Sequence, residues 1–589
     1  MQEQWILNGR QADFAAIAGK LSVPSLVVKL MINRGIKESG MKSFLGGNLT
    51  EFSDPYLMKD MKKACDIFLK AANNNDTVAI VTDYDCDGIF SGMVLYSCFS
   101  RIGIKARLFT PDRVKEGYGL NKRIIDEAYN MGINYIITCD NGIAAYDEVL
   151  YAKSLGMTVV ITDHHEVPFV INEAGKEYVL PGADAVIDPK QEDCKYPFKG
   201  LCGAGVAYRI ADALYGIRNI PDNEKELLLI YAAAATVADI MELNGENRII
   251  VKEGLKLFSH TDNPGLKAIK EVNNLADVQI TPYHIGFVIG PCFNAAGRLK
   301  SVAPAFELLM SDDEKVVHKR ALELKELNEY RKNMTEEGAE RALAMALLPE
   351  NAACNVLVLY ISDCHESLIG IIAGRVKDRV HKPVIVFTDA PDNTYKGSAR
   401  SIEAYSMFDE LTKVKELFLK FGGHKMAAGM TIPKENLNVL RERLNKNQTL
   451  TKKDLIPVVR IDAEVLIRHM SIPVIESFSV LEPFGCGNPK PLFAGRHFNI
   501  MQARVIGRNN NVLKCIISDI ENNVCEALYF GDIEEFINMI EEHFGSEEKD
   551  KMLRGAKNNT DVALAFNAEI NEYNGLKSVQ FIIQNYCII

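Results

Sequence analysis

Short apolar runs alternate with helix-length segments between about residues 75 and 240. Three of the runs, at positions 77–81, 135–139 and 159–162, are rich in β-branched residues and lead directly into acidic or histidine residues. Alternation of this kind is typical of a parallel sheet that helices cover on both faces. The pattern therefore predicts an α/β domain with polar clusters at the carboxyl ends of its strands, where such sheets bind ligands.

The segment from Ser311 to Pro349 has a helical composition, rich in Ala, Leu, Glu, Lys and Arg. Ser311 and Glu314 have the spacing of a capping box, which starts a helix, and only Gly338 interrupts the composition. We expect one long helix, or two in line. At about 1.5 Å per residue it would reach roughly 55 Å, enough to connect two lobes.

A second α/β segment follows, with buried strands expected at 355–360 and 383–387, and it ends near an Asn- and Lys-rich linker at 445–448. From about residue 455 the strands are short and alternating, which indicates a small β-barrel or sandwich. The predicted domains are an N-terminal segment (1–70), a first α/β domain (71–310), a connecting helix (311–350), a second α/β domain (351–450), and a barrel domain with the C-terminal segment (455–589).

The net charge of −11 argues against a protein that coats nucleic acid, because phosphate binding depends on clustered Lys and Arg. It leaves room for local basic grooves and suits a site that collects divalent cations. The 13 cysteines include no CxxC pair, which favours reduced thiols and a cytoplasmic location. No apolar run approaches the roughly 18 residues of a membrane span, and the N-terminus does not resemble a secretion signal.

Asp85 and Asp87 follow the first predicted strand of the α/β domain. Residues two apart at the end of a strand point to the same side, so their carboxylates repel unless a cation lies between them. Gly88 then allows a sharp turn into the next helix. Carboxylate oxygens suit Mg²⁺ and Mn²⁺. A solvated acidic turn is the alternative interpretation of this segment taken alone.

Three further clusters strengthen the metal interpretation. Asp140 follows the second strand, the Asp-His-His triplet at 163–165 follows the third, and Asp239 follows an Ala-rich helical segment. Asp239 would be expensive to bury without a partner or a metal, although a helix-terminal carboxylate is also consistent with its position. Together the clusters predict a site for two cations that hydrolyses a phosphodiester. The sequence disfavours zinc, since no cysteine set accompanies the ligands, and a serine hydrolase, since no G-x-S-x-G motif is present.

The chain resembles the DHH phosphoesterase superfamily, named for the triplet that stands here at 163–165, and within it the RecJ proteins. Similar motifs occur in the same order over more than 400 residues. They lie at 82–88, 117–120, 138–142, 236–239, 294–299, 365–370, 398–401, 422–429 and 481–489. The resemblance implies a parallel-sheet DHH domain, a long connecting helix, a DHH-associated α/β domain and a C-terminal OB-fold.

The same resemblance implies a 5′→3′ exonuclease that hydrolyses single-stranded DNA to mononucleotides in recombination and repair, with two Mn²⁺ or Mg²⁺ ions. The family's metal ligands correspond to Asp85, Asp87, Asp140, His164 and Asp239. His165 is expected near the scissile phosphate, and Asp83 and Asn141 are expected to support the ligands. Val81 stands where some relatives have a metal-binding histidine, which predicts a thinner site. A single-strand-binding protein and a helicase are the expected partners of a monomer that does not contact membranes.

The resemblance also predicts a site for the 5′-terminal phosphate and neighbouring nucleotides in the second lobe. The residues expected to bind substrate are Arg298, Ser398, Arg400, Gly423 and His424. A surface salt bridge is the alternative for each arginine, and helix capping is the alternative for His365. Gly297 and Gly370 favour packing roles. The OB-fold would bind single strands by base stacking and a basic groove, or act as a structural clamp.

Two other functions compete with this prediction. Another DHH phosphodiesterase would act on short RNA or cyclic dinucleotides, which would not require the long N-terminal segment or the OB-like C-terminus. A catalytically silent DNA-binding scaffold would not need the whole set of acidic and histidine residues. Cys86, between two expected ligands, is expected in a strand with its side chain pointing away from the metals, in a packing role.

Overall fold

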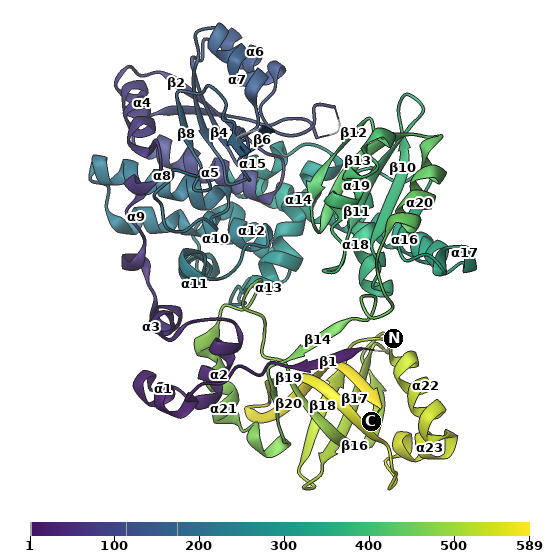
Figure 1. The fold of residues 1–589 in the computed structure, drawn as a ribbon. Coiled ribbons are helices and arrows are strands. Elements are labelled where there is room, and N and C mark those ends of the chain that lie inside the picture. The colour runs from purple at the N-terminus through teal and green to yellow at the C-terminus, as the bar shows by residue number, and fades with distance from the viewer. Residues whose placement is uncertain (1–2, 114, 173–174, 589) are drawn as a thin grey trace. The chain divides into compact units, whose positions relative to one another are not determined.

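The structure is a computed structural model that describes residues 3–588, except 114 and 173–174. Figure 1 shows its fold. The chain forms two compact units. The larger contains residues 48–456, and the smaller combines the described residues up to Gly47 with those from Pro457 onward. The predicted domain limits stay predictions, but the N-terminal segment divides: residues up to Gly47 join the C-terminal unit, and residues 48–70 join the larger one.

The larger unit contains a five-stranded parallel sheet with the strand order β3-β2-β4-β5-β8. Its strands are β2 (Thr77–Thr82), β3 (Lys105–Phe109), β4 (Tyr135–Cys139), β5 (Thr158–Thr162) and β8 (Ala185–Ile187). Along β2, Val78 and Ile80 enter a core with α4 (Met61–Asn73), α5 (Cys86–Arg101) and α8 (Gly203–Arg218). Ala79 and Val81 enter the opposite core with α6 (Lys122–Asn130) and α7 (Tyr146–Ser154). Helices therefore cover both faces, as predicted.

The Ala-rich segment forms α10 (Leu229–Ala238), which packs against α11 (Gly245–Ser259). Small residues let the two helices approach closely. A Cβ at Gly254 would lie 2.4 Å from the carbonyl oxygen of Leu229 and 2.5 Å from the Cβ of Ala233. This packing fixes the C-terminal end of α10, where Asp239 caps the helix.

The connecting helix is one element, α16 (Glu314–Ala346), and its 33 residues span about 50 Å. The predicted capping box is wrong. Asp313 is the N-cap and accepts the N–H groups of Lys315 and Val316, two residues after the Ser311 N-cap that the box would require. Gly338 does not interrupt the helix. Its missing side chain leaves room for Ile372, whose Cδ1 would lie 2.5 Å from a Cβ there.

The second sheet has the strand order β12-β13-β11-β10-β9. Its strands are β9 (Leu357–Tyr360), β10 (Val384–Ala390), β11 (Thr394–Arg400), β12 (Lys420–His424) and β13 (Ala427–Pro433). The helix α18 (Ile369–Val380) covers one face, and α20 (Asn436–Asn447) covers the other. The expected linker at 445–448 is therefore wrong for its first three residues. They complete α20, because Asn445 hydrogen-bonds both backbone groups of Val356.

The smaller unit is a closed barrel with the strand order β15-β16-β17-β18-β20-β19, closed by pairing of β16 with β19. Its strands are β15 (Ala463–Glu464), β16 (Phe493–Ile506), β17 (Val512–Asp519), β18 (Val524–Tyr529), β19 (Asp561–Tyr573) and β20 (Leu576–Ile588). Its N-terminal residues join through β1 (Gln4–Leu7), which pairs in parallel with β14 (Val458–Ile461). The predicted small barrel is confirmed.

Within the described residues, no single helix has both the length and the apolar character needed to cross a membrane. One bent pair, α1 (Phe14–Leu21) and α2 (Ser25–Asn33), meets those two criteria together, with a bend of 108°. Val27, Val28, Leu30 and Met31 of α2 are fully buried in the core of the smaller unit.

Replacing Gly254 by Ala should destabilise the larger unit, because the new methyl group would overlap the backbone of α10. Overpacking of this kind costs about 1–3 kcal/mol. Gly216 in α8 is the matched control, since a Cβ there meets no atom within 4 Å and alanine is favoured in helices. Thermal unfolding should give a lower midpoint for Gly254→Ala and an unchanged or higher midpoint for Gly216→Ala. Equal midpoints for the two variants would contradict the close packing.

Candidate active site

The predicted polar clusters meet at one edge of the parallel sheet. The strands β2, β4 and β5 are neighbours, and Thr82, Cys139 and Thr162 end them on the same side. The residues that follow these strand ends supply Asp85, Asp140 and His164. Asp239 approaches from the C-terminal end of α10, and its carboxylate lies 3.8 Å from Nε2 of His164.

The first acidic segment begins a helix, which corrects the strand geometry expected for it. Asp85 is the N-cap of α5, and its Oδ1 accepts the N–H of Gly88 at 3.1 Å. Cys86 and Asp87 lie in the first helical turn. The prediction that Cys86 lies in a strand is therefore wrong. Its side chain is buried in the core, which is consistent with the predicted packing role. A glycine is needed at position 88 because a Cβ there would lie 2.5 Å from the carbonyl oxygen of Asp83.

Asp87 also accepts hydrogen bonds from the N-terminus of α8. Its two carboxylate oxygens accept the N–H groups of Gly203 at 2.7 Å and Ala204 at 2.8 Å, at the start of α8. Free N–H groups at a helix N-terminus favour an anion. Asp87 therefore anchors α8 as well as facing His164, whose Nε2 lies 3.7 Å from its Oδ2.

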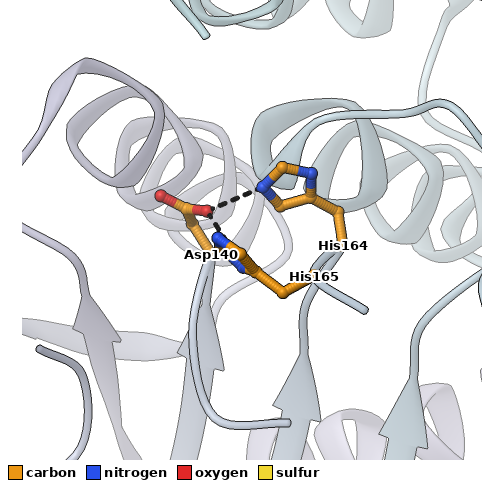
Figure 2. A group of neighbouring side chains, drawn as sticks. All are labelled: Asp140, His164 and His165. Atoms are coloured by element: carbon orange, nitrogen blue, oxygen red, sulfur yellow. Dashed lines mark hydrogen bonds and ion pairs between the residues drawn. The ribbon is translucent and has the colours of Figure 1, made fainter. Parts of the chain in front are cut away.

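The Asp-His-His triplet forms a tight turn organised by Asp163. Its carboxylate accepts the N–H groups of Ile143, His164 and His165, and its Oδ1 lies 2.7 Å from Nδ1 of His165. Figure 2 shows both imidazoles turned toward Asp140, with Nε2 of His164 at 3.1 Å and Nδ1 of His165 at 4.0 Å. Asp163 therefore orients the two histidines and is itself buried behind them.

Three overlapping groups of side chains could each hold a metal ion, and within each group the ligand atoms lie within 4.8 Å of one another. The groups are Asp140, His164 and His165; Asp87, His164 and Asp239; and Asp83, Asp85 and Asp140. Asp140 and His164 are each shared by two groups, which suits two adjacent cations. Asp83, which we expected only to support the ligands, itself belongs to a potential metal-binding group.

The electrostatics of this edge favour bound cations. Burial, followed by repulsion from neighbouring carboxylates, raises the pKa of Asp85 and raises those of Asp83 and Asp140 well above the usual range. The same causes raise the pKa of Asp239 to about 8. Oδ1 of Asp83 and Nδ1 of His164 are buried without a hydrogen-bond partner. Nε2 of His164 faces Asp87, Asp140 and Asp239. An oxygen-rich set with a neutral imidazole fits Mg²⁺ or Mn²⁺, which would give Oδ1 of Asp83 a partner and offset the repulsion.

His165 differs from His164 in protonation. Burial lowers the pKa of both imidazoles, but at His165 the hydrogen bond to Asp163 and the negative charges of the nearby carboxylates together outweigh burial and raise the pKa to about 9. At His164 burial dominates, and the pKa stays below its ordinary value. His164 is therefore neutral and suited to be a ligand, whereas His165 is a cation beside the cluster.

Two residues close to the cluster were not singled out from the sequence as functional. Tyr118 donates its hydroxyl to the carbonyl oxygen of Asp140 and lies 3.2 Å from Nδ1 of His165. Arg113 stacks over Tyr84, 4.6 Å from the ring centroid. The Gly-Tyr-Gly segment at 117–119 was the available signal for Tyr118. No local pattern marks Arg113.

Asn141 and Asp140 have backbone roles as well. Asn141 donates to the carbonyl oxygens of Val81 and Cys139, and its Oδ1 accepts the N–H of Leu120. It therefore ties β4 to β2 and to the loop that carries Tyr118. Asp140 adopts a left-handed conformation with φ of 62°, which only glycine, asparagine and aspartate adopt readily.

The C-terminal end of α10 holds Asp239 by a Schellman motif. The N–H of Ile240 bonds to Val237 and that of Met241 bonds to Thr236. The left-handed position of such a motif usually holds glycine, but here Ile240 occupies it with φ of 56°. A β-branched residue is strained in this region, by roughly 1–2 kcal/mol. The strain lies directly beside a potential metal ligand.

Three of the residues expected to bind substrate converge near the N-terminus of α18. Arg298 donates to the carbonyl oxygen of Ser367, just before α18 begins. A Cβ at Gly370, in the first turn, would lie 2.9 Å from Oγ of Ser398 and 3.1 Å from the guanidinium of Arg400. These residues therefore place two guanidinium groups and a hydroxyl beside free helix N–H groups, an arrangement that suits a phosphate.

His424 shares a sheet face with Arg400. In the register of β12, β13 and β11, His424 is opposite Ala427, and Ala427 is opposite Arg400, so the Cα atoms of His424 and Arg400 are about 10 Å apart. Gly423 has φ of 155°, and a Cβ there would lie 2.4 Å from the carbonyl oxygen of Ala427. Strand pairing therefore gives a structural reason for this glycine, and its contact with substrate stays a prediction. His365 accepts from Ser367, which favours the capping alternative.

The arginines on this side of the site lack carboxylate partners among the described residues. Burial, and then repulsion from Arg113 and Arg331, lowers the pKa of Arg298 to about 10. Burial, and then repulsion from Arg375, lowers that of Arg331. The salt-bridge alternative for Arg298 and Arg400 is therefore wrong. A group of unpaired guanidinium ions is costly unless an anionic ligand joins it.

Without divalent metal, the stability of the larger unit should fall as pH rises from 6 to 8. Folding raises the pKa of Asp239 from 3.8 to about 8, so the folded chain holds that proton more tightly and loses stability as the proton leaves. Thermal unfolding in a chelator should show this fall. The slope of the unfolding free energy against pH should be shallower for Asp239→Asn than for wild type, by up to about 1 kcal/mol per pH unit. Added Mn²⁺ should remove the fall in wild type. Identical slopes for wild type and Asp239→Asn would contradict the assignment.

Family models match three separate parts of the chain. The DHH family, N-terminal domain, matches residues 77–235, the DHHA1 domain matches 354–449, and the RecJ OB domain matches 461–585. These are the parallel-sheet domain, the second α/β domain and the barrel described above.

Similar proteins and solved structures extend over nearly the whole chain. The single-stranded-DNA-specific exonuclease RecJ of Bacillus subtilis is 33% identical, over 98% of this chain and 70% of that protein, and the one of Escherichia coli is 31% identical, over 99% of both. The structure of Thermus thermophilus RecJ in complex with Mn²⁺ matches 99% of this chain and 79% of that chain, with 23% identity and a TM-score of 0.80. An exonuclease RecJ bound to manganese matches 66% of this chain and 94% of its own, with 27% identity and a TM-score of 0.56. With its three domains matched in order and its length covered by these relatives, the chain belongs to the RecJ family.

Proposed function

We propose that this chain is an exonuclease that depends on Mn²⁺ or Mg²⁺ and hydrolyses single-stranded DNA from the 5′ end to mononucleotides. The observation that carries the proposal is the clustering of carboxylates and imidazoles into three groups, with Asp140 and His164 each belonging to two of them. The RecJ relatives, named as single-stranded-DNA-specific exonucleases, support the substrate. The proposed biological role is DNA recombination and repair.

Two ions would be held by Asp85, Asp87, Asp140, His164 and Asp239, with Asp83 as a further oxygen donor. Ions bound there would polarise the phosphodiester and lower the pKa of a water molecule. The chain's own contribution is to hold these ligands in place before substrate arrives. Asp163, Tyr118 and Asn141 fix the loops that carry the ligands, and the start of α8 fixes Asp87.

His165 would bind the scissile phosphate. Its Nδ1 is held by Asp163, and its Nε2 has no partner among the described residues. Because its pKa is about 9, the ring is protonated at neutral pH, so Nε2–H can donate to a phosphate oxygen and stabilise the charge that develops there. Its side chain is 45% exposed, which leaves room for a ligand.

The end of the strand would be held by Arg298, Ser398 and Arg400 at the start of α18, with Arg113 and Arg331 adding positive charge. A terminal phosphate carries more negative charge than an internal one and suits this unpaired group. The proposal also includes contacts of the strand with Gly423 and His424 and binding of the strand by the barrel. It further includes a monomeric state, a cytoplasmic location, and partnership with a single-strand-binding protein and a helicase.

Single-stranded DNA labelled at either end, with Mn²⁺ or Mg²⁺, should lose its 5′ label first, as mononucleotide. Asp140→Asn should reduce the rate at least about 100-fold, because it removes a charge shared by two metal groups. Asparagine tolerates the left-handed backbone at this position, so the fold should be kept. Cleavage of only short RNA or a cyclic dinucleotide would favour the small-substrate phosphodiesterase, and DNA binding without cleavage of any substrate would favour the scaffold.

Asp140→Asn is a cleaner variant than Asp87→Ala. Removing the Asp87 carboxylate would also leave the N–H groups of Gly203 and Ala204 without acceptors in a buried place. Each buried group left unsatisfied costs about 1–3 kcal/mol. Lost activity in Asp87→Ala would therefore combine a catalytic effect with a structural one.

The preference for a 5′-phosphate should depend on Arg400. Wild type should cleave 5′-phosphorylated strands in preference to 5′-hydroxyl strands, and Arg400→Met should lose about 10- to 100-fold of that preference, the value of a charge-assisted hydrogen bond. Arg443→Met is the control, because Arg443, which lies on α20, forms an ion pair with Glu416. The measurement is the ratio of kcat/KM for the two substrates. An unchanged ratio in Arg400→Met would remove Arg400 from the phosphate site.

A further inference from the structure

Two aromatic side chains are stacked on each other at the surface of the larger unit. Tyr283 is 63% exposed and Phe287 is 67% exposed, although both are large and apolar. Their ring centroids lie 5.2 Å apart with an interplanar angle of 29°, so they present adjoining ring surfaces. No step of the proposed reaction uses them. Exposed apolar side chains that adjoin in this way usually mark a binding surface.

The pair belongs to a helix that passes the active site. The short helix α13 (Pro282–His284), a π-helical turn (Ile285–Ile289) and α14 (Gly290–Leu299) follow one another without a break. The π-helical turn packs on the end of α10. A Cβ at Gly286 would lie 3.8 Å from Val237, and one at Gly290 would lie 3.5 Å from Ala238. The turn that carries Phe287 is therefore next to the residues that precede Asp239. Turns of this π-helical kind are frequent at functional sites.

The other end of the same helix reaches the first acidic segment and the phosphate side. Asn294 accepts the N–H of Cys86 at 2.9 Å, and Gly297 packs against the carbonyl oxygen of Tyr84. Arg298 follows directly. Along this helix the order is therefore Arg298, the segment that carries Asp85 and Asp87, the end of α10 with Asp239, and then Phe287 and Tyr283.

The spacing of Phe287 and Arg298 places the two positions on about the same side of the helix. They are eleven residues apart, which is about three helical turns and roughly 16 Å. A stacked single strand advances about 3.4 Å per nucleotide, so this distance corresponds to about five nucleotides. A strand whose terminal phosphate lies at Arg298 would therefore pass the potential metal ligands and reach Phe287 at about its fifth nucleotide.

We propose that Tyr283 and Phe287 form a platform on which bases of the single strand stack, several nucleotides from the cleaved bond. This inference rests on the proposed function. Stacking on aromatic rings suits a substrate of any sequence, because every base has a flat face. A short RNA or a cyclic dinucleotide would not reach the platform. The platform therefore favours long strands and holds the incoming strand while its end is cleaved.

The test compares wild type with Tyr283→Ala/Phe287→Ala on a 20-nucleotide strand and on a trinucleotide, both with a 5′-phosphate and Mn²⁺. KM for the 20-nucleotide strand should rise roughly 5- to 100-fold, the value of one or two stacked bases, and the trinucleotide should be cleaved as by wild type. Tyr129→Ala is the control, because Tyr129 is an exposed tyrosine on α6. It should behave as wild type on both substrates.

Abasic sites give a readout that a structural role would not change. Removing bases four to six from the 5′ end should raise the wild-type KM by the same factor, and the double variant should lose nothing further. An unchanged KM in the double variant would overturn the platform. Equal losses on the trinucleotide and the long strand would also overturn it, since they indicate a shift of Asp239 instead.

The failure of the proposed function is distinguishable from the failure of the platform. Equilibrium binding of the 20-nucleotide strand, measured by fluorescence anisotropy in a chelator, should weaken in the double variant by a similar factor. A wild-type chain that binds the strand through the platform but leaves it intact with Mn²⁺ would overturn the exonuclease proposal and retain the platform. A wild-type chain that cleaves the strand and binds it no better than the double variant would overturn the platform and retain the exonuclease proposal.

Discussion

Repulsion among buried carboxylates is the constraint on which the rest of this site depends. Asp83 and Asp85 approach from the turn between β2 and α5, Asp87 from the first turn of α5, Asp140 from the end of β4, and Asp239 from the end of α10. The fold offsets only part of the cost, through backbone N–H groups to Asp85 and Asp87 and through His164 to Asp140. The remainder is visible in raised pKa values. Such a cluster is stable when ionised only if cations lie within it.

Close approach between elements creates the cluster and explains where the chain lacks side chains. A Cβ at Gly203 would lie 2.6 Å from the Cβ of Asp140, so only glycine lets α8 direct its N-terminus at Asp87. Gly88, at the start of α5, and Gly254, in the contact between α10 and α11, likewise leave no room for a Cβ. Because these contacts involve backbone atoms, they leave little room for relaxation. The ligands are therefore held by close packing between elements and by loops that hydrogen bonds fix in place.

The sequence predicted the sheet and the cluster because both leave local signals. Buried parallel strands are continuous apolar runs, and each polar cluster directly follows one. What it missed depends on contacts between distant residues. The same Asp-x-Asp spacing suits a strand end or a helix start, and only the N–H groups of Gly88 and α8 decide for the helix. The parallel pairing of β1 with β14, which joins the N-terminal residues to residues 458–461, leaves no local trace.

Arg113, Arg331 and Arg375 were missed for the same reason, since each is an ordinary charged residue in its own segment. Among the described residues these arginines have no carboxylate partner, which becomes visible only when the elements are assembled. It reconciles the acidic net charge with a polyanionic substrate. The negative charge is gathered where cations are needed, and unpaired positive charge is gathered beside α18. The helix that ends at Arg298 connects these two regions and continues to Tyr283. The binding sites along this helix extend over some 16 Å. A small substrate can occupy only one of these sites at a time. A long strand that is shortened at one end stays bound at the remaining sites.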